Sequence, residues 1–364
     1  MAQRLARQPI ITKGANSNPV RERYLVHINL TEVRFFNFYK KMKIKTAECV
    51  SPMHPDKFCD YIADTILDAY LEKDKDSRCA IEVMGGHNLI VINGEVNSRK
   101  EIDIEKIVKK LIGNNFRLIS NIVKQSPEIA RGVDIGGAGD QGIMCGYATD
   151  ETNTYMPLEY ELARNLCNYI YNKYPFDGKT QITINNGNIQ KIVASFQNAK
   201  SKDLREIVTK WIQKNAIKKE SIPQYEIFIN PAGDWSQGGF DADTGLSGRK
   251  IIIDNYGPEI PIGGGSFSGK DYTKVDRSGA YMARKIAVDL LKKYNAKKVY
   301  TKLAYAIGER NPVMAIAKVD GNEIEIKGYD LSPAGIRNFL DLDKIKFSET
   351  SNWGHFGRKF PWDK

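Results

Sequence analysis

Residues 54–73, HPDKFCDYIADTILDAYLEK, carry the clearest helical pattern in the chain. Apolar side chains recur every four residues, at Phe58, Ile62, Ile66 and Tyr70, which is the spacing of one helix face. Pro55 suits a first helical turn, and the acidic residue that follows it complements the positive end of the helix dipole. The pattern therefore predicts a helix over residues 56–73.

Three aspartates recur with the same spacing on another face of this predicted helix. They are Asp60, Asp64 and Asp68. A stripe of charged residues opposite an apolar stripe is typical of the side of a helix that faces water. We therefore expect these three carboxylates to be solvated.

Outward from this segment, helices and strand pairs alternate along the chain. Further helices are predicted at 99–112, 157–173, 201–215, 277–294 and 333–341. Strands are predicted at 79–84, 89–92, 181–184, 190–194, 225–229, 250–254, 299–306 and 313–319. Strand pairs interleaved with helices recur roughly three times, which indicates a two-layer α/β architecture with an internal structural repeat.

The composition is that of a globular protein. The chain has 364 residues, of which 41% are hydrophobic, and a formal net charge of +10. Residues 1–41 alone carry +6 and residues 42–364 only +4, so the charge is not that of a nucleic-acid-binding surface. No apolar run approaches the ~18 residues that a membrane span needs.

The first 41 residues differ from the rest. They are rich in arginine and show little sustained periodicity, whereas a sharper pattern begins at Met42. Two interpretations remain open: a basic targeting extension, or an upstream leader with Met42 as the working start. We favour the leader.

Cysteine and histidine usage excludes two kinds of site. The five cysteines are odd in number and no pair has CxxC spacing, so neither a disulfide framework nor a zinc site is indicated. The four histidines are never three or four residues apart, which argues against a histidine-built metal centre. A reducing cytoplasm fits this usage best.

Three short motifs point to familiar functions but stand in the wrong context. Residues 137–142 match G-x-G-x-x-G, but no buried strand precedes them and no clear helix follows. Residues 264–270 match G-x-x-x-x-G-K, but Asp271 stands where a P-loop needs Ser or Thr. Residues 54–57 match the HPD loop of J-domain co-chaperones, but no basic helix precedes them.

The distribution of charged residues is more informative than any of these motifs. Basic residues adjoin glycines or acidic residues near positions 54–57, 177–179, 249–250, 270–271 and 274–276. Carboxylates interleave with them, at Asp56, Asp140, Asp243, Asp271 and Asp276. Hard oxygen ligands beside cationic side chains are what a magnesium–polyphosphate site requires.

From Met42 to Lys364 the chain resembles the S-adenosylmethionine synthetase (methionine adenosyltransferase) family. The resemblance rests on five signatures in the family's order, at 54–57, 137–142 continuing to 147–152, 243–250, 263–271 with 274–278, and 354–358.

The resemblance implies an α+β fold of three intertwined, structurally repeated subdomains in a pseudo-threefold arrangement. The corresponding boundaries are a basic N-terminal extension or leader at 1–41, an N-terminal domain at 42–135, a central domain at 136–237 and a C-terminal domain at 238–364. It further implies a cytoplasmic homodimer or homotetramer with active sites between subunits, with neither nucleic acid nor membrane as a partner.

The family's reaction joins ATP to L-methionine with the help of Mg²⁺ and K⁺. The thioether sulfur attacks C5′ of ATP and displaces the triphosphate, which is then hydrolysed to phosphate and pyrophosphate. Because a thioether carries no proton, the first step needs no general base, and positioning and charge stabilisation can supply the catalysis.

Roles are implied residue by residue. The catalytic residues would be His54, Lys179, Arg249, Lys250 and Lys270. The ATP site would comprise these five together with Asp177, Gly178, Asp234, Trp235, Asp243 and Ser266. Methionine would contact Glu95, Gln125, Asp243 and Lys274. Asp56 and Asp276 would ligate magnesium, and Glu82 would help to hold potassium. The resemblance implies that Trp235 stacks on adenine, whereas a lone tryptophan taken by itself favours core packing.

Several positions depart from the family pattern. Pro52 and Met53 replace Glu-Gly, the loop 126–136 is shortened, Asp234 stands for Arg, and Asn198 stands for His. These departures leave two alternatives to S-adenosylmethionine synthesis. One is hydrolysis of tripolyphosphate or use of a methionine analogue. The other is a weakly active subunit that binds and regulates an active homologue.

Overall fold

The computed structural model describes residues 44–364, apart from 127–131, 134–135 and 216–224. The predicted role of residues 1–41 as an extension or leader lies outside the described residues. So does most of the shortened loop at 126–136.

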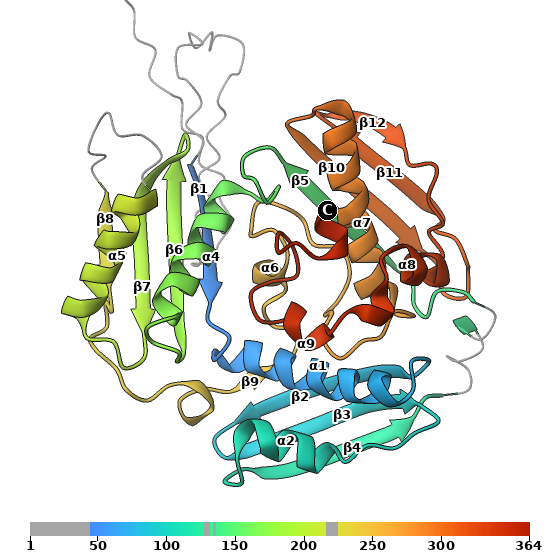
Figure 1. The fold of residues 1–364 in the computed structure, drawn as a ribbon, viewed down its shortest axis with the longest axis horizontal. Helices are drawn as coiled ribbons and strands as arrows, with labels where there is room; N and C mark the ends of the chain where they lie inside the picture. Colours follow the sequence, from blue (N-terminus) through green and yellow to red (C-terminus); the bar gives the residue numbers. More distant parts are fainter. Residues whose placement is uncertain (1–43, 127–131, 134–135, 216–224) are drawn as a thin grey trace, which may run out of the picture. The chain divides into compact units, whose positions relative to one another are not determined.

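The described residues form three four-stranded sheets (Figure 1). The middle sheet contains, in spatial order, β1 (Ile44–Val50), β6 (Gly178–Asn185), β7 (Asn188–Phe196) and β8 (Glu226–Ile229). The N-terminal sheet contains β9 (Gly245–Leu246), β2 (Arg78–Gly86), β3 (Leu89–Asn97) and β4 (Arg117–Lys124). The C-terminal sheet contains β5 (Gly142–Thr149), β10 (Lys298–Tyr305), β11 (Met314–Val319) and β12 (Asn322–Glu325).

Each sheet takes its first strand from another third of the chain. β1 pairs antiparallel with β6 of the middle sheet, β5 with β10 of the C-terminal sheet, and β9 with β2 of the N-terminal sheet. The three repeats thus exchange strands cyclically. This exchange confirms the prediction of three intertwined repeats.

One long helix packs on each sheet. α1 (Pro55–Lys73) packs on β2 and β9, α4 (Leu158–Tyr171) on β6 and β1, and α7 (Val275–Tyr294) on β10 and β5. The same side-chain bond recurs in two repeats: Thr180 Oγ1 donates to the Ala163 carbonyl (2.7 Å) and Thr301 Oγ1 to the Ala283 carbonyl (2.8 Å). Each repeat is a two-layer unit that buries its helix against the exchanged strand.

The fourth strand distinguishes the repeats. In the N-terminal and middle sheets it runs parallel to its neighbour, and the crossovers are the helices α2 (Ile104–Ile112) and α5 (Ser201–Asn215). In the C-terminal sheet β11 and β12 instead form an antiparallel pair. The remaining short elements are η2 (Gly239–Asp241), α6 (Ile251–Asp254), α8 (Pro333–Phe339), η3 (Leu342–Lys344), α9 (Phe347–Thr350) and η4 (Pro361–Asp363). No helix among the described residues is both long and apolar enough to cross a membrane.

Most predicted elements are present, but the predicted strand at 250–254 is wrong. These residues form the helical turn α6. Lys250 Nζ lies 2.5 Å from Asp56 Oδ2, and Asp254 is bonded to Lys57. The two partners are adjacent in α1, whereas a strand would hold residues 250 and 254 about 13 Å apart. The ion pairs therefore favour the turn over the β propensity of the intervening isoleucines.

The predicted helix at 99–112 begins later, at Ile104. The side chain of Asp103 accepts a hydrogen bond from the Lys106 amide at 2.9 Å, which caps the helix. An aspartate cap fixes the first turn immediately after itself.

The expectation that the aspartate stripe of α1 is solvated is also wrong. Asp60 and Asp64 are fully buried. Asp60 accepts the Gly248 amide at 2.9 Å, Asp64 the Gly269 amide at 2.8 Å, and Asp68 the Phe347 amide at 2.8 Å. The stripe is thus a row of acceptors for backbone segments of the C-terminal third.

Candidate active site

The first group of predicted site residues gathers at the start of α1. His54 is the N-cap, and its Nδ1 accepts the Asp56 amide at 3.2 Å. Asp56 accepts the Leu246 amide at 2.9 Å and the Lys250 ammonium at 2.5 Å, and Arg249 Nε lies 3.5 Å from it. We call His54, Asp56, Lys179, Asp243, Arg249 and Lys250 the His54 cluster.

Burial and nearby cations keep His54 neutral. Burial, followed by the charges of Lys250 and Lys179, lowers the pKa of His54 to about 3. Burial alone would raise the pKa of Asp56, but the hydrogen bonds from Lys250 and from the Leu246 amide outweigh it and hold that pKa below its usual value. Since Nδ1 of His54 is an acceptor, its proton resides on Nε2. The imidazole is therefore an uncharged donor beside two lysines.

The low pKa of His54 gives a testable pH dependence. Above about pH 6.5 the imidazole is neutral in both the folded and the unfolded chain, so it contributes no pH dependence. As the pH falls from 6.5 towards 3, only the unfolded chain binds the proton, and stability is lost. We expect the stability difference between wild type and His54→Asn to shift against the wild type between pH 7 and pH 4, as measured by urea unfolding. An unchanged difference, or an NMR titration of His54 near pH 6.5, would contradict the assignment.

Asp177 and Gly178 lie beside Lys179 of the His54 cluster, at the start of β6. Asp177 Oδ2 accepts the Gly239 amide at 3.1 Å, whereas its buried Oδ1 has no partner among the described residues. Burial raises the pKa of Asp177. A Cβ on Gly178 would lie 2.3 Å from the Phe196 ring, so only glycine fits there. The Lys179 side chain is exposed, and its charge acts on His54 and Asp177.

The predicted nucleotide contacts after β8 are less uniform. Trp235 is half-buried, and its Nε1 donates to Ser195 Oγ at 3.0 Å, so it is not a fully buried core residue. Asp234 accepts the Ser201 amide (2.9 Å) and the Asn230 side chain (3.2 Å). These bonds place Asp234 at the start of α5, a structural role that the sequence did not indicate.

A second group lies along β2 and the start of α7. Lys270 Nζ lies 2.7 Å from Asp276 Oδ2, and the Gly265 amide donates to Asp276 Oδ1 at 2.9 Å. Glu82 is hydrogen-bonded to Ser247, and the buried Ser266 Oγ has no partner among the described residues. We call Glu82, Ser247, Ser266, Lys270 and Asp276 the Lys270 cluster.

The predicted methionine contacts other than Asp243 lie on or next to the N-terminal sheet. Glu95 pairs across strands with Ala80, and Ala80 forms a bridge with Lys270; cross-strand partners point to one face of a sheet. Gln125 is buried just after β4, and its Oε1 has no partner among the described residues. Lys274 is paired with Asp271 at 2.6 Å.

Among the described residues, no element covers the face of the N-terminal sheet opposite α1. It presents Glu82 and Glu95 together with apolar residues that are 38–49% exposed, namely Met84, Ile119, Val123 and Leu246. An apolar sheet face without a covering layer is typical of a protein interface.

The two clusters are not directly bonded to each other in the described part of the chain, and they meet along the chain where Ser247 of one lies two residues before Arg249 of the other. Among the described residues, no hydrogen bond or ion pair joins a side chain of the His54 cluster to one of the Lys270 cluster. Sequence reasoning missed Ser247, Asp60, Asp64 and Arg277, which hold the clusters in place. For Asp60 and Asp64, the four-residue period of the aspartates was a signal that could have found them.

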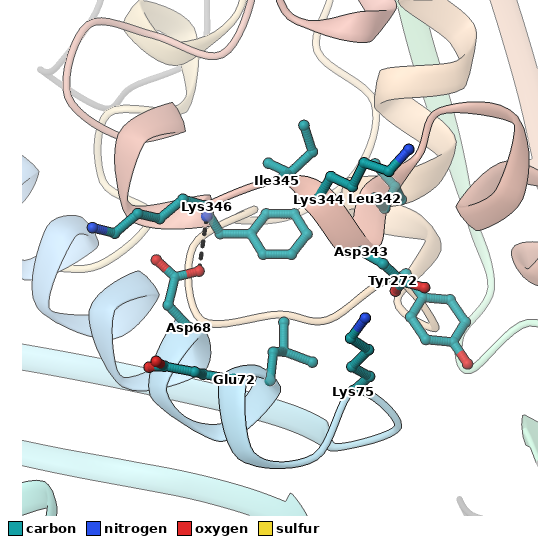
Figure 2. Close-up of a pocket in the computed structure, with 11 residues that line it drawn as sticks. Asp68, Glu72, Lys75, Tyr272, Leu342, Asp343, Lys344, Ile345 and Lys346 are labelled. Atoms are coloured by element: carbon teal, nitrogen blue, oxygen red, sulfur yellow. Dashed lines mark hydrogen bonds between the residues drawn. The ribbon is translucent and has the colours of Figure 1, made fainter.

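A cavity of about 510 Å³ lies away from both clusters, between α1 and the segment 342–347 (Figure 2). It is lined by residues that include Asp68, Lys75, Tyr272 and Lys344, and no predicted site residue borders it.

Comparisons with known proteins identify the family of the chain. Family models of S-adenosylmethionine synthetase match residues 42–117 (N-terminal domain), 135–235 (central domain) and 237–364 (C-terminal domain). The S-adenosylmethionine synthase of Mycoplasmopsis pulmonis is 42% identical over 358 residues, covering 88% of this chain and 95% of its own. That of Petrotoga mobilis is 40% identical over 394 residues, covering 89% and 96%.

A solved structure is also similar. It is described as an unusual S-adenosylmethionine synthetase from Campylobacter jejuni, with a TM-score of 0.79, 34% identity and coverage of 88% of this chain and 96% of that one. The fold and the similarities define an enzyme of the transferase class. The chain belongs to the S-adenosylmethionine synthetase family.

Proposed function

We propose that this protein makes S-adenosylmethionine by attack of the methionine sulfur on C5′ of ATP, displacement of the triphosphate and its hydrolysis to phosphate and pyrophosphate. The observation that carries the proposal is that in each cluster a lysine ammonium is paired with a single carboxylate, while His54 is uncharged. Such groups stabilise a highly charged leaving group.

The His54 cluster would bind one side of the triphosphate. Neutral His54 can donate Nε2–H to a phosphate oxygen, while Lys179, Arg249 and Lys250 supply positive charge. In the structure Lys250 is paired with Asp56. When phosphate binds, the Lys250 ammonium would exchange this carboxylate for a phosphate oxygen. The nucleoside would be bordered by Asp177, Gly178, Trp235 and Asp243. Asp234 would contribute less to the nucleotide site, because its side chain is already bonded to Ser201 and Asn230.

The carboxylates fit magnesium held jointly with phosphate. The described residues contain no group of three or more His, Cys, Asp or Glu side chains able to hold a metal ion. Mg²⁺ typically binds through one or two carboxylates together with substrate phosphates. Asp56 and Asp276 would each supply one such carboxylate. Glu82 would hold potassium, and methionine would contact Glu95, Gln125 and Lys274. The Gln125 Oε1, which has no partner among the described residues, suits a bound amine.

We further propose a homodimer, alone or paired into a tetramer, in which the His54 cluster of one copy faces the Lys270 cluster of the other. The open face of the N-terminal sheet carries Glu82, Glu95 and exposed apolar residues, and a second copy on this face would complete the site. We also propose three domains, at 42–135, 136–237 and 238–364. Each of these domains gives one strand to the sheet of another. The proposed location is the cytoplasm.

The test is an assay of the purified protein with ATP, methionine, Mg²⁺ and K⁺. S-adenosylmethionine is followed by mass spectrometry and phosphate by colour assay, and we expect both products to depend on methionine. Phosphate without the sulfonium product would favour the triphosphatase or methionine-analogue alternative. Neither product, with no thermal stabilisation by nucleotide, would favour the regulatory subunit.

A further inference from the structure

A buried ion pair lies beneath Lys270. Asp64 of α1 and Arg277 of α7 are 0% and 1% exposed. The guanidinium donates to both carboxylate oxygens, from Nη1 to Oδ1 at 2.7 Å and from Nη2 to Oδ2 at 2.8 Å. This two-pronged geometry fixes both side chains.

The pair binds the main chain on both sides of the Lys270 side chain. The Gly269 amide donates to Asp64 Oδ1 at 2.8 Å, and Arg277 Nη1 donates to the Lys270 carbonyl at 3.1 Å. The direction in which Lys270 leaves the backbone is therefore set by two buried charges.

The turn that contains Gly269 and Lys270 cannot easily shift towards β2 either. Gly269 has φ +78°, and a Cβ there would lie 2.0 Å from the Ile81 carbonyl oxygen. The Ile81 amide donates to the Gly269 carbonyl at 3.1 Å. The turn is thus held between β2 and the ion pair.

Further hydrogen bonds hold the Arg277 side chain in place. Nε donates to Tyr281 Oη and Nη2 to Thr350 Oγ1, both at 3.0 Å. Tyr281 Oη lies 2.7 Å from His355 Nδ1, and its ring stacks on Trp362 at 3.7 Å between centroids. A fully bonded, buried guanidinium has little freedom to relax when its partner changes.

We propose that Asp64 and Arg277 are positioning residues for Lys270. They act through the backbone of Gly269 and Lys270 to place the ammonium that meets the triphosphate. This inference rests on the proposed function of Lys270 and extends it to two residues that contact no substrate.

The first test compares Asp64→Asn with Asp68→Asn. Both aspartates lie on α1 and accept backbone amides, but Asp68 holds Phe347 and Ser348, away from both clusters. We expect Asp64→Asn to lower kcat about 10- to 100-fold, because small misplacement of a catalytic group is costly, with KM for ATP nearly unchanged. Asp68→Asn should lower Tm and keep kcat. Full kcat in folded Asp64→Asn would overturn the inference.

A double-mutant cycle separates positioning from general damage. If Asp64 acts through Lys270, then Asp64→Asn should cost less than about 3-fold in a Lys270→Ala background. Equal costs in both backgrounds would overturn the positioning role and leave the proposed function standing. Wild-type turnover in Lys270→Ala would instead overturn the proposed role of Lys270 at the triphosphate.

Arg277→Lys provides a second route should Asp64→Asn fail to fold. Lysine keeps the charge but cannot make the two-pronged contact. We expect a similar loss of kcat, with faster hydrogen exchange at the Gly269 amide. Wild-type kcat and exchange in this variant would overturn the proposal.

Discussion

Lys179→Ala should lower kcat about 10²- to 10³-fold, which is the usual cost of removing one preorganised charge at a developing anion. Lys179 lies on β6 opposite Val50 and Ser195, and its exposed side chain makes no hydrogen bond or ion pair to the described residues. The loss should therefore fall on chemistry and leave folding intact. The measurement is steady-state production of S-adenosylmethionine, with circular dichroism and Tm as folding checks.

Lys191→Ala is a suitable control for this variant. Lys191 lies on the neighbouring strand β7, is exposed, and within the described part of the chain forms a single ion pair, with Glu226 at 3.4 Å. Its loss should leave kcat unchanged. Wild-type turnover in Lys179→Ala would show that the ammonium does not touch the triphosphate.

Gly146→Ala should destabilise the fold by about 3 kcal/mol or more, at or beyond the upper end of the usual cost of overpacking. Gly146 lies on the exchanged strand β5 where α7 crosses it, and a Cβ would lie 2.2 Å from the carbonyl carbon and oxygen of Ala283. The obstacle is backbone, so α7 and β5 would have to separate. Urea unfolding measures the effect.

Gly142→Ala is the matched control on the same strand. A Cβ there would meet only the flexible end of Met144, at 3.0 Å. We expect a cost under about 1 kcal/mol. Equal stability of the two variants would contradict the close packing of α7 on the exchanged strand.

Elements with strong local patterns could be predicted from the sequence. The i, i+4 apolar spacing of residues 58–70 located α1, and Ser332-Pro333 marked the start of α8, whose first turn is capped by the Ser332 side chain. The exchanged strands could not be predicted in the same way. β1, β5 and β9 bond to partners more than a hundred residues away, and no local signal identifies a distant partner.

The site could be predicted only in part. Signatures located Lys270 and Asp276, which the structure brings to 2.7 Å. Spacing alone could not distinguish a solvated aspartate stripe from a buried one, because burial depends on the segments that cover it. For the same reason Ile251, Ile252 and Ile253 suggested a strand, although the contacts of Lys250 and Asp254 with α1 impose a helical turn.

The central claim is that each active site combines the His54 cluster of one copy with the Lys270 cluster of another. The most direct test co-expresses Lys179→Ala and Lys270→Ala chains with different tags and purifies the mixed dimer. One site of that dimer carries both substitutions and the other carries neither. We expect about half of wild-type activity from the mixed dimer, although each variant alone is nearly inactive. A mixed dimer as inactive as its parents would place both clusters in a site within one chain and contradict the account.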